Sequence, residues 1–347
     1  MNKFSFDPES TTVAEYMYYW YYTFSYGGIR TSTKRDYKNN IKNHINPCIG
    51  DMLLSECKTD ILQEFFNDMR EHGNLKTGGE LSAKTLQNIK GMMYTAFNKA
   101  VVLEYIPRNY IDGVDLPTMI KKEIHVFSPQ EERSIKTHSL YDDNLDYGFA
   151  YWLGATFGLR NGEICALKWT DFDFDRMELH IRRAIKREVS ADVNAQHNTY
   201  LTIGAPKTDK SNRTIPFNDS TRDKILSIRH KRLSSNYYGK RYAKDKFKDF
   251  IFLNDNGSYA NTSAVYRNFM TFLHSIGIDN TNYTMHTLRH TFATRGIEKG
   301  VDIKTLSELL GHTSVQFTLD TYTHVLDDQK RKVMDILLND DTESSCK

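Results

Sequence analysis

Residues 286–294 constrain the fold more strongly than any other stretch, and they read His286-Thr287-Leu288-Arg289-His290-Thr291-Phe292-Ala293-Thr294. His286 and Arg289 lie three residues apart, so on a helix both side chains point to the same side. Leu288 and Phe292 lie four residues apart and would share the side that faces a core. The stretch therefore predicts a helix with one side that packs apolar side chains into a core and another side that holds a histidine and an arginine close together.

Four further stretches carry cationic, histidine or tyrosine side chains, and each of them alone is common by chance. They are Gly158-Leu159-Arg160-Asn161-Gly162-Glu163, Pro206-Lys207-Thr208, Leu309-Leu310-Gly311-His312 and Asp320-Thr321-Tyr322-Thr323-His324. Gly311 is expected to end a helix over Asp302–Leu310, which would present the His312 ring at a helix end. Lys207 falls between two predicted strands, in a hairpin loop.

The first 115 or so residues predict a small helical domain. Thr12 and Glu15 form the S/T-x-x-E pattern of a capping box, which satisfies free backbone N–H groups at a helix start. The Tyr-rich segment 16–24 is read as part of an amphipathic core helix. Further helices are predicted over Thr33–Ile45, ended by Pro47 and Gly50, over Asp60–Glu71, and from Ser82 onward.

Residues 116–127 break the helical periodicity and are interpreted as a linker, after which Ser128 and Glu131 form a second capping box. The domain expected over 128–326 is mixed. Helices are predicted at 129–139, 144–157 and 161–168, three strand-like runs at 177–185, 200–203 and 213–217, and mainly helix after Asp219. The strand runs predict a small antiparallel sheet. Residues 327–347 are expected to form a C-terminal helix and tail, with Val333, Ile336 and Leu337 on one stripe.

Composition excludes several classes of protein. The chain has 347 residues, no run of 18 apolar residues and no apolar N-terminal segment, so we expect a cytoplasmic protein without a membrane span. The four cysteines are scattered without a Cys/His cluster, which argues against disulfides and a metal site. Net charge is only +2, but residues 222–249 hold ten Lys/Arg against three Asp, a local net of 10 − 3 = +7. Such a patch is compatible with either a nucleic-acid contact or a solvated face.

Taken in order, the five stretches resemble the catalytic domain of the lambda-integrase family of tyrosine recombinases. Flanking residues 162–169 and 288–294 match as well, and the resemblance extends over 130–326, with 12–115 resembling the family's helical, SAM-like core-binding domain. It implies a mixed, mainly α fold with an α+β catalytic domain. It also implies a site-specific recombinase or integrase that cuts and rejoins DNA through a 3′-phosphotyrosyl bond, for integration or excision of a mobile element. No cofactor is implied.

The resemblance assigns a role to each residue. Arg160 and Arg289 would clamp the reacting phosphate, since a guanidinium fork pairs two oxygens and stays charged. Tyr322 would be the nucleophile and Lys207 the general acid, with Lys210 as a substitute for it. The remaining members are His286, His312 and the supporting carboxylate Glu163. The two histidines would hydrogen-bond the phosphate or handle the proton of the nucleophile, and the sequence does not assign these two roles between His286 and His312. His290, His324 and Tyr283 are read as packing or capping residues.

The resemblance also implies partners. Duplex DNA is the expected substrate, bound by a homo-tetramer on two DNA sites. A small directionality factor is a possible further partner, and the sequence does not decide whether one is needed. Because the helical domain is predicted to begin at Thr12, we expect no arm-binding domain of the kind that many family members carry. Two alternatives stay open at this point: a type IB topoisomerase, which shares the tyrosine, arginine and lysine chemistry, and a non-catalytic DNA-binding protein of the same fold.

Overall fold

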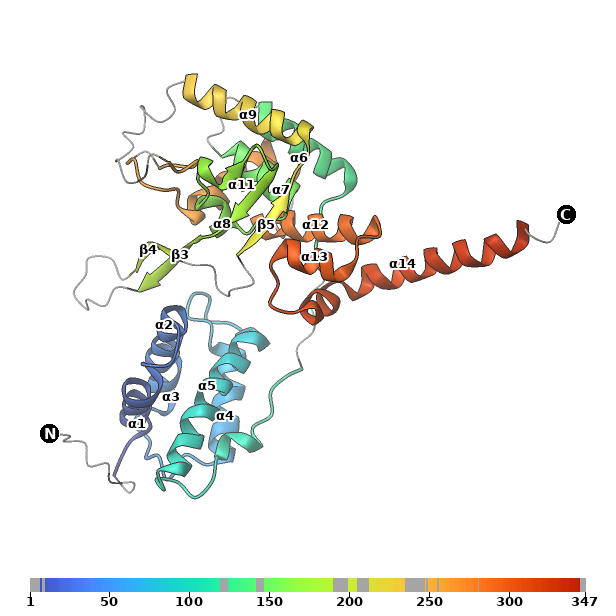
Figure 1. Ribbon diagram of the computed structural model, residues 1–347. Coiled ribbons are helices and arrows are strands. Elements are labelled where there is room, and N and C mark those ends of the chain that lie inside the picture. Colours follow the sequence, from blue (N-terminus) through green and yellow to red (C-terminus); the bar gives the residue numbers. More distant parts are fainter. Residues whose placement is uncertain are drawn as a thin grey trace. The chain divides into compact units, whose positions relative to one another are not determined.

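A computed structural model describes residues 7, 10–118, 124–141, 147–189, 199–204, 212–234, 247, 249–254, 256–279 and 281–343 of the chain. The chain divides into two compact units (Figure 1). Unit 1 is Met1–Lys122 with Glu188–Tyr200, and unit 2 is Glu123–Arg187 with Leu201–Lys347. Mainly helical structure with small sheets confirms the predicted fold class.

Unit 1 is a helical bundle around one apolar core. Its elements are α1 Val13–Trp20, η1 Tyr21–Ser25, α2 Thr31–Asn40, η2 Ile41–Ile45, α3 Asn46–Ile49, α4 Thr59–His72, α5 Ala83–Val102 and η3 Tyr110–Gly113. The predicted capping box is present, because the Thr12 side chain accepts from the Glu15 N–H while Glu15 accepts from the Thr12 N–H. Trp20 and the apolar faces of α4 and α5 are buried in the core.

Pro47 does not end the second helix, contrary to the prediction. The chain passes from α2 through the π-helical turn η2 into α3, and the helical run ends at Gly50. The Asn46 N–H bonds the Ile41 carbonyl across the π turn, so the hydrogen-bond pattern restarts just before the proline. Pro47 then lies in the first turn of α3, where a missing N–H has little cost.

Unit 2 combines helices with two small sheets. The helices are α6 Pro129–Tyr141, α7 Gly148–Phe157, α8 Asn161–Cys165, η4 Trp169–Asp171, α9 Asp219–Ser234, α11 Thr262–Ser275, α12 Met285–Glu298, α13 Ile303–Leu310 and α14 Val315–Glu343. The strands are β1 Phe172–Asp173, β2 Glu178–Ile181, β3 Ala184–Val189, β4 Thr199–Gly204 and β5 Arg213–Pro216, of which the end of β3 and the start of β4 are counted with unit 1. No described helix is both long and apolar enough to cross a membrane.

The single predicted strand run 177–185 is in fact two strands in different sheets. β2 pairs antiparallel with β1 and β5, whereas β3 pairs with β4. Arg183 lies in the break between them, and its guanidinium forks onto the buried Asp171 at 2.7 and 3.0 Å. The break between the two strands thus coincides with a residue whose side chain is paired with a buried carboxylate.

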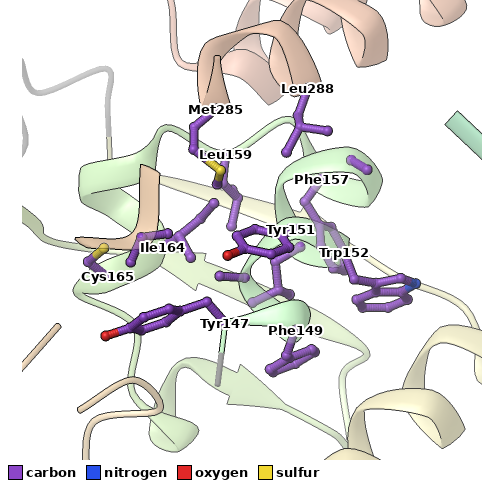
Figure 2. Packing of buried hydrophobic residues seen from close by; sticks show 14 of the residues in the cluster. Tyr147, Phe149, Tyr151, Trp152, Phe157, Leu159, Ile164, Cys165, Met285 and Leu288 are labelled. Atoms are coloured by element: carbon purple, nitrogen blue, oxygen red, sulfur yellow. The ribbon is translucent and has the colours of Figure 1, made fainter. Parts of the chain in front are cut away.

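Helix α7 is the centre of the core of unit 2, and nearly all of its residues are buried. Figure 2 shows Met285 and Leu288 projecting from α12 toward Leu159, next to the aromatic residues of α7. Burial of Leu288 confirms the predicted inner side of the 286–294 helix. The functional residues of this helix are thereby held on a rigid support.

Gly158, which ends α7, has a left-handed backbone with φ +63°, and a Cβ built there would lie 2.6 Å from the Phe292 ring. We predict that Gly158→Ala lowers the free energy of unfolding by about 1–3 kcal/mol, from backbone strain and this clash. Gly91→Ala is the control, because Gly91 is exposed within α5 and its Cβ would meet nothing within 4 Å. It should stabilise by about 0.5–1 kcal/mol. Calorimetry checks both, and an unchanged transition for Gly158→Ala would contradict the strain.

Candidate active site

The site is organised around the C-terminal end of α13. Gly311 adopts φ +64°, and its N–H bonds the Glu308 carbonyl while the His312 N–H bonds the Ser307 carbonyl, each at 3.0 Å. These two bonds form a Schellman motif, which ends a helix cleanly. The predicted helix stop at Gly311 is confirmed. Carbonyls beyond those two are left to find other partners, and a helix C-terminus attracts cations.

Three arginines donate to three successive carbonyls at this helix end. Arg213 Nε donates to Leu309 at 2.7 Å, Arg289 Nη2 to Leu310 at 2.6 Å and Arg160 Nη2 to Gly311 at 2.9 Å. The arginines come from β5, from α12 and from the residue before α8. The end of α13 thus draws together cationic groups that lie far apart in the sequence.

Glu163 is the carboxylate that joins two of these arginines. It is 2% exposed, and Arg213 forks onto it at 3.0 and 2.9 Å while Arg160 Nη1 donates at 2.8 Å. Burial raises the pKa of Glu163, but the bonds and charges of Arg213 and Arg160 outweigh it and hold the pKa at about 2. The side chain is therefore ionised near neutral pH and orients Arg160.

Arg289 is held differently, because its contacts carry no net charge. The side chain is 1% exposed, and besides Leu310 it donates to the Gly158 carbonyl at 3.0 Å. Carbonyl dipoles position a guanidinium without neutralising it. Desolvation, followed by repulsion from Arg160, lowers the pKa of Arg289 to about 9, which still leaves the group charged at neutral pH.

Two histidines of α12 lie next to these arginines. The His286 and His290 rings meet edge to face with centroids 4.5 Å apart. Desolvation, then repulsion by Arg289 and Arg160, lowers the pKa of His286 to about 4. Since His286 is exposed, repulsion by the guanidinium groups is the cause that the geometry supports best. Desolvation, then His286 and Arg289, lowers the pKa of His290 to about 4, so both rings are neutral near pH 7.

His312 follows the helix stop and is buried. Its Nδ1 lies 2.7 Å from the hydroxyl of the fully buried Thr318, and the Phe317 ring packs against it edge to face at 4.9 Å. Desolvation, followed by repulsion from Arg289 and Arg160, lowers the pKa of this ring to about 3. His312 is thus a neutral ring with a fixed orientation beside the arginines.

Tyr322 lies within α14 and its backbone, at φ −115° and ψ 24°, leaves the helical region and kinks the helix. The side chain is 1% exposed, and its hydroxyl lies 2.8 Å from His290 Nδ1. Burial raises the pKa of Tyr322 to about 12, against an opposing effect of Arg289. The phenol is therefore protonated at neutral pH. Beyond the kink, Figure 1 shows α14 projecting away from the other elements of unit 2.

The structure brings Arg160, Glu163, Arg289, His312 and Tyr322 together around α13, with His286 on the same helix as Arg289. Lys207 and Lys210 lie outside the described residues, as do the side chains of His324, Val333, Ile336 and Leu337. Tyr283 packs on Phe127 with ring centroids 4.2 Å apart, in line with a packing residue.

Two members of the site were missed by sequence reasoning. Arg213 was assigned to a strand and nothing more, although a buried Glu163 needs a cationic partner. His290 was read as a packing residue, whereas it touches the Tyr322 hydroxyl. Its spacing of four residues from His286 on a helix was the available indication that both histidines face one side.

The arrangement suits an anion with several oxygens. Arg160 and Arg289 are fixed by backbone contacts, stay charged and lie beside neutral histidines that can donate or accept a proton. Among the described residues, no group of three or more His, Cys, Asp or Glu side chains could hold a metal ion.

Comparison with known proteins identifies the family. The model of the phage integrase family matches residues 126–329, and that of the phage integrase N-terminal SAM-like domain matches residues 12–70. A tyrosine recombinase XerC-like protein of Caldanaerobacter subterraneus subsp. tengcongensis is 29% identical over 97% of this chain and 85% of its own length. The ICEBs1 integrase of Bacillus subtilis is 26% identical over 88% of this chain and 78% of its own.

Solved structures share the fold. The Tn1549 transposon integrase, in complex with a circular intermediate DNA, matches with a TM-score of 0.75 and 24% identity, over 94% of this chain and 100% of that one. A lambda integrase tetramer bound to a Holliday junction matches with a TM-score of 0.63 and 17% identity, over 89% and 77%. The family match spans most of unit 2, with the order of active-site residues described above. The chain belongs to the phage integrase family and is a tyrosine recombinase with an N-terminal SAM-like domain.

Proposed function

We propose that this recombinase integrates or excises a mobile element by cutting and rejoining DNA through a 3′-phosphotyrosyl bond to Tyr322. The observation that carries the proposal is the gathering of Arg160 and Arg289 at the end of α13, in the same site as a tyrosine hydroxyl held by a histidine. A tyrosine ester conserves the energy of the phosphodiester bond for religation. The rejoining step then needs no nucleotide hydrolysis.

The two arginines act on the phosphate. Attack on a phosphodiester places additional negative charge on the non-bridging oxygens, and preorganised cationic donors stabilise that charge more than they stabilise the ground state. Arg289 is rigid because it is buried between two carbonyls, and Arg160 because Glu163 and Gly311 hold it. His286 and His312, both neutral, complete the set of groups around the phosphate. Lys207 is the proposed general acid for the leaving 5′-oxygen.

The parts of the chain divide this work. We assign residues 1–115 to core-type contacts with duplex DNA, 116–127 to a linker, 128–326 to catalysis and 327–347 to assembly. Support for the last comes from α14, where Met334 and Leu338 are at least half exposed on a projecting helix. An apolar surface of this kind favours burial against another protomer. A homo-tetramer on two DNA sites, with room for a small directionality factor, is the assembly that we propose.

Tyr322→Phe should bind the target duplex, meaning a duplex with the short repeats that flank the gene, with unchanged affinity and form no covalent complex. The variant loses only the attacking oxygen. Tyr266→Phe, on the exposed face of α11, is the matched control and should react normally. A series of duplexes nicked at successive positions traps the adduct, which is detected on a denaturing gel. An adduct formed by Tyr322→Phe would exclude this nucleophile.

Arg160→Ala should lower the single-turnover cleavage rate by about 10²–10³, the usual effect of losing one such donor, with little change in binding. Glu163 keeps Arg213 as its partner, so the variant leaves no buried carboxylate unpaired. Arg289→Lys, which retains the charge without the fork, should show a comparable loss. Arg267→Ala removes an exposed arginine of α11 as control. Cleavage by Arg160→Ala at the rate of the control would contradict the phosphate clamp.

Removal of residues 327–347 should leave binding to one half-site intact and abolish the four-protomer complex and strand exchange. Analytical ultracentrifugation on DNA measures the assembly. Met334→Ser with Leu338→Ser tests the exposed apolar residues alone, and Asp335→Ser is the control on the same exposed stretch. If the truncated protein still forms tetramers and recombines paired sites at the full rate, the helix is not the link between protomers.

A further inference from the structure

The contact between His290 and Tyr322 helps to identify the nucleophile, but His290 itself has no chemical step in the reaction described so far. His290 Nδ1 lies 2.8 Å from the Tyr322 hydroxyl oxygen, a normal hydrogen-bond length, and the two rings meet at an angle of 64° with centroids 5.8 Å apart. Because His290 is neutral, its Nδ1 can accept the phenol proton when Nε2 carries the ring proton. The Tyr322 hydroxyl, which must lose a proton during attack, is thus already hydrogen-bonded to a base.

The other two histidines of the site are placed for other work. His312 Nδ1 is engaged with Thr318 at 2.7 Å. His286 is exposed and its ring packs edge to face against the His290 ring at 4.5 Å, whereas the described hydrogen bond of the Tyr322 hydroxyl is to His290. An attacking oxygen transfers its proton most readily to a group within hydrogen-bond reach. Among the described histidines, His290 meets this condition.

We propose that His290 is a catalytic residue, the general base that takes the Tyr322 proton during cleavage. This inference rests on the proposed function of Tyr322. As the Tyr322 oxygen–phosphorus bond forms, the bond from phosphorus to the 5′-oxygen breaks, and the phenol proton passes to His290 Nδ1. The leaving 5′-oxygen takes a proton from a separate donor, Lys207. On religation the 5′-hydroxyl attacks phosphorus and gives its proton back to Lys207, the bond from phosphorus to the Tyr322 oxygen breaks, and His290 returns its proton to the departing phenolate.

The charges around His290 couple this transfer to bound DNA. His290 faces His286 and Arg289 from its own helix and Tyr322 from α14, and protonation of His290 would also disfavour protonation of His312. With the pKa of Tyr322 at about 12 and that of His290 at about 4, the proton stays on the phenol in the free protein. A phosphate bound at Arg160 and Arg289 offsets part of the positive charge and makes His290 a stronger base. Reactive phenolate therefore forms only together with attack.

The test separates a proton acceptor from a mere hydrogen-bond acceptor. His290→Asn places an amide oxygen near the position of Nδ1, so the phenol keeps an acceptor that cannot take its proton. The control is His274→Asn, an exposed histidine of α11. Single-turnover cleavage of the nicked target duplex is measured from pH 6 to 9.5. Melting temperature and DNA affinity verify folding, and His290→Gln repeats the assay if the asparagine variant melts lower.

The wild-type rate should be nearly flat above pH 6.5, because a lowered pKa keeps His290 unprotonated throughout this range. For His290→Asn we expect a loss of about 10²–10⁴ at pH 7, the usual contribution of a general base. The remaining rate should rise about tenfold per pH unit, following the phenolate fraction below the phenol pKa. Sulfur at the bridging 5′ position should rescue Lys207→Ala, since a thiolate leaves without a proton, but not His290→Asn.

Two results would overturn the assignment. One is cleavage by His290→Asn at the rate of His274→Asn. The other is a reduced rate with a flat pH profile, which would make His290 a positioning residue only. If the wild-type protein itself forms no adduct that Tyr322→Phe abolishes, then the proposed function fails together with this inference. An adduct that depends on Tyr322 but not on His290 removes the inference alone.

Discussion

Three neighbouring backbone carbonyls at the end of α13 accept hydrogen bonds from three different arginines, and the rest of the site depends on this contact. A buried guanidinium carries a large desolvation cost unless its donors are satisfied. The carbonyl end of a helix satisfies donors and lowers the energy of a cation at the same time. It does so without supplying a negative charge of its own, and for a site that binds an anion this distinction is decisive.

The charge that remains explains the titration behaviour of the neighbouring side chains. Arg160, Arg213 and Arg289 carry three positive charges and Glu163 one negative, so 3 − 1 leaves a net of +2 among these four side chains. This excess contributes to the lowered pKa of His286, His312 and Arg289. Repulsion among these arginines lowers the folding stability of the protein when no ligand is bound, as is common in functional sites. A bound phosphodiester supplies the missing negative charge.

Sequence reasoning succeeded where spacing within one element carried the information. Leu288 was correctly placed on the inner side of its helix, and Gly311 was correctly placed at a helix stop. It failed where a partner lies far away in the chain. Arg213 is fifty residues from Glu163, and no local pattern pairs them. Likewise, Arg183 lies between the two strands of the 177–185 run and pairs with Asp171, which it meets only in the folded chain.

His290 was misread for a related reason, since a histidine beside an arginine on a half-buried helix is usually a packing residue. Its role depends on the backbone of α14 leaving helical geometry at Tyr322, which turns the phenol toward α12. Residues 320–324 contain no proline or glycine that would mark such an irregularity. The kink is a property of the packed chain rather than of the local sequence.

Because the anchors at residues 309–311 are main-chain atoms, the site has an unusual tolerance to mutation built into it. Every residue type offers the same backbone carbonyl. Substitution of Leu309 or Leu310 therefore leaves the hydrogen bonds to the arginines in place, as long as the helix ends at the same residue. Among residues 309–311, the backbone itself ties only Gly311 to its identity, through its positive φ. The length of α13 sets the positions of the carbonyls and hence the geometry of the active site. A single inserted or deleted residue in α13 would therefore disturb this geometry more than several substitutions.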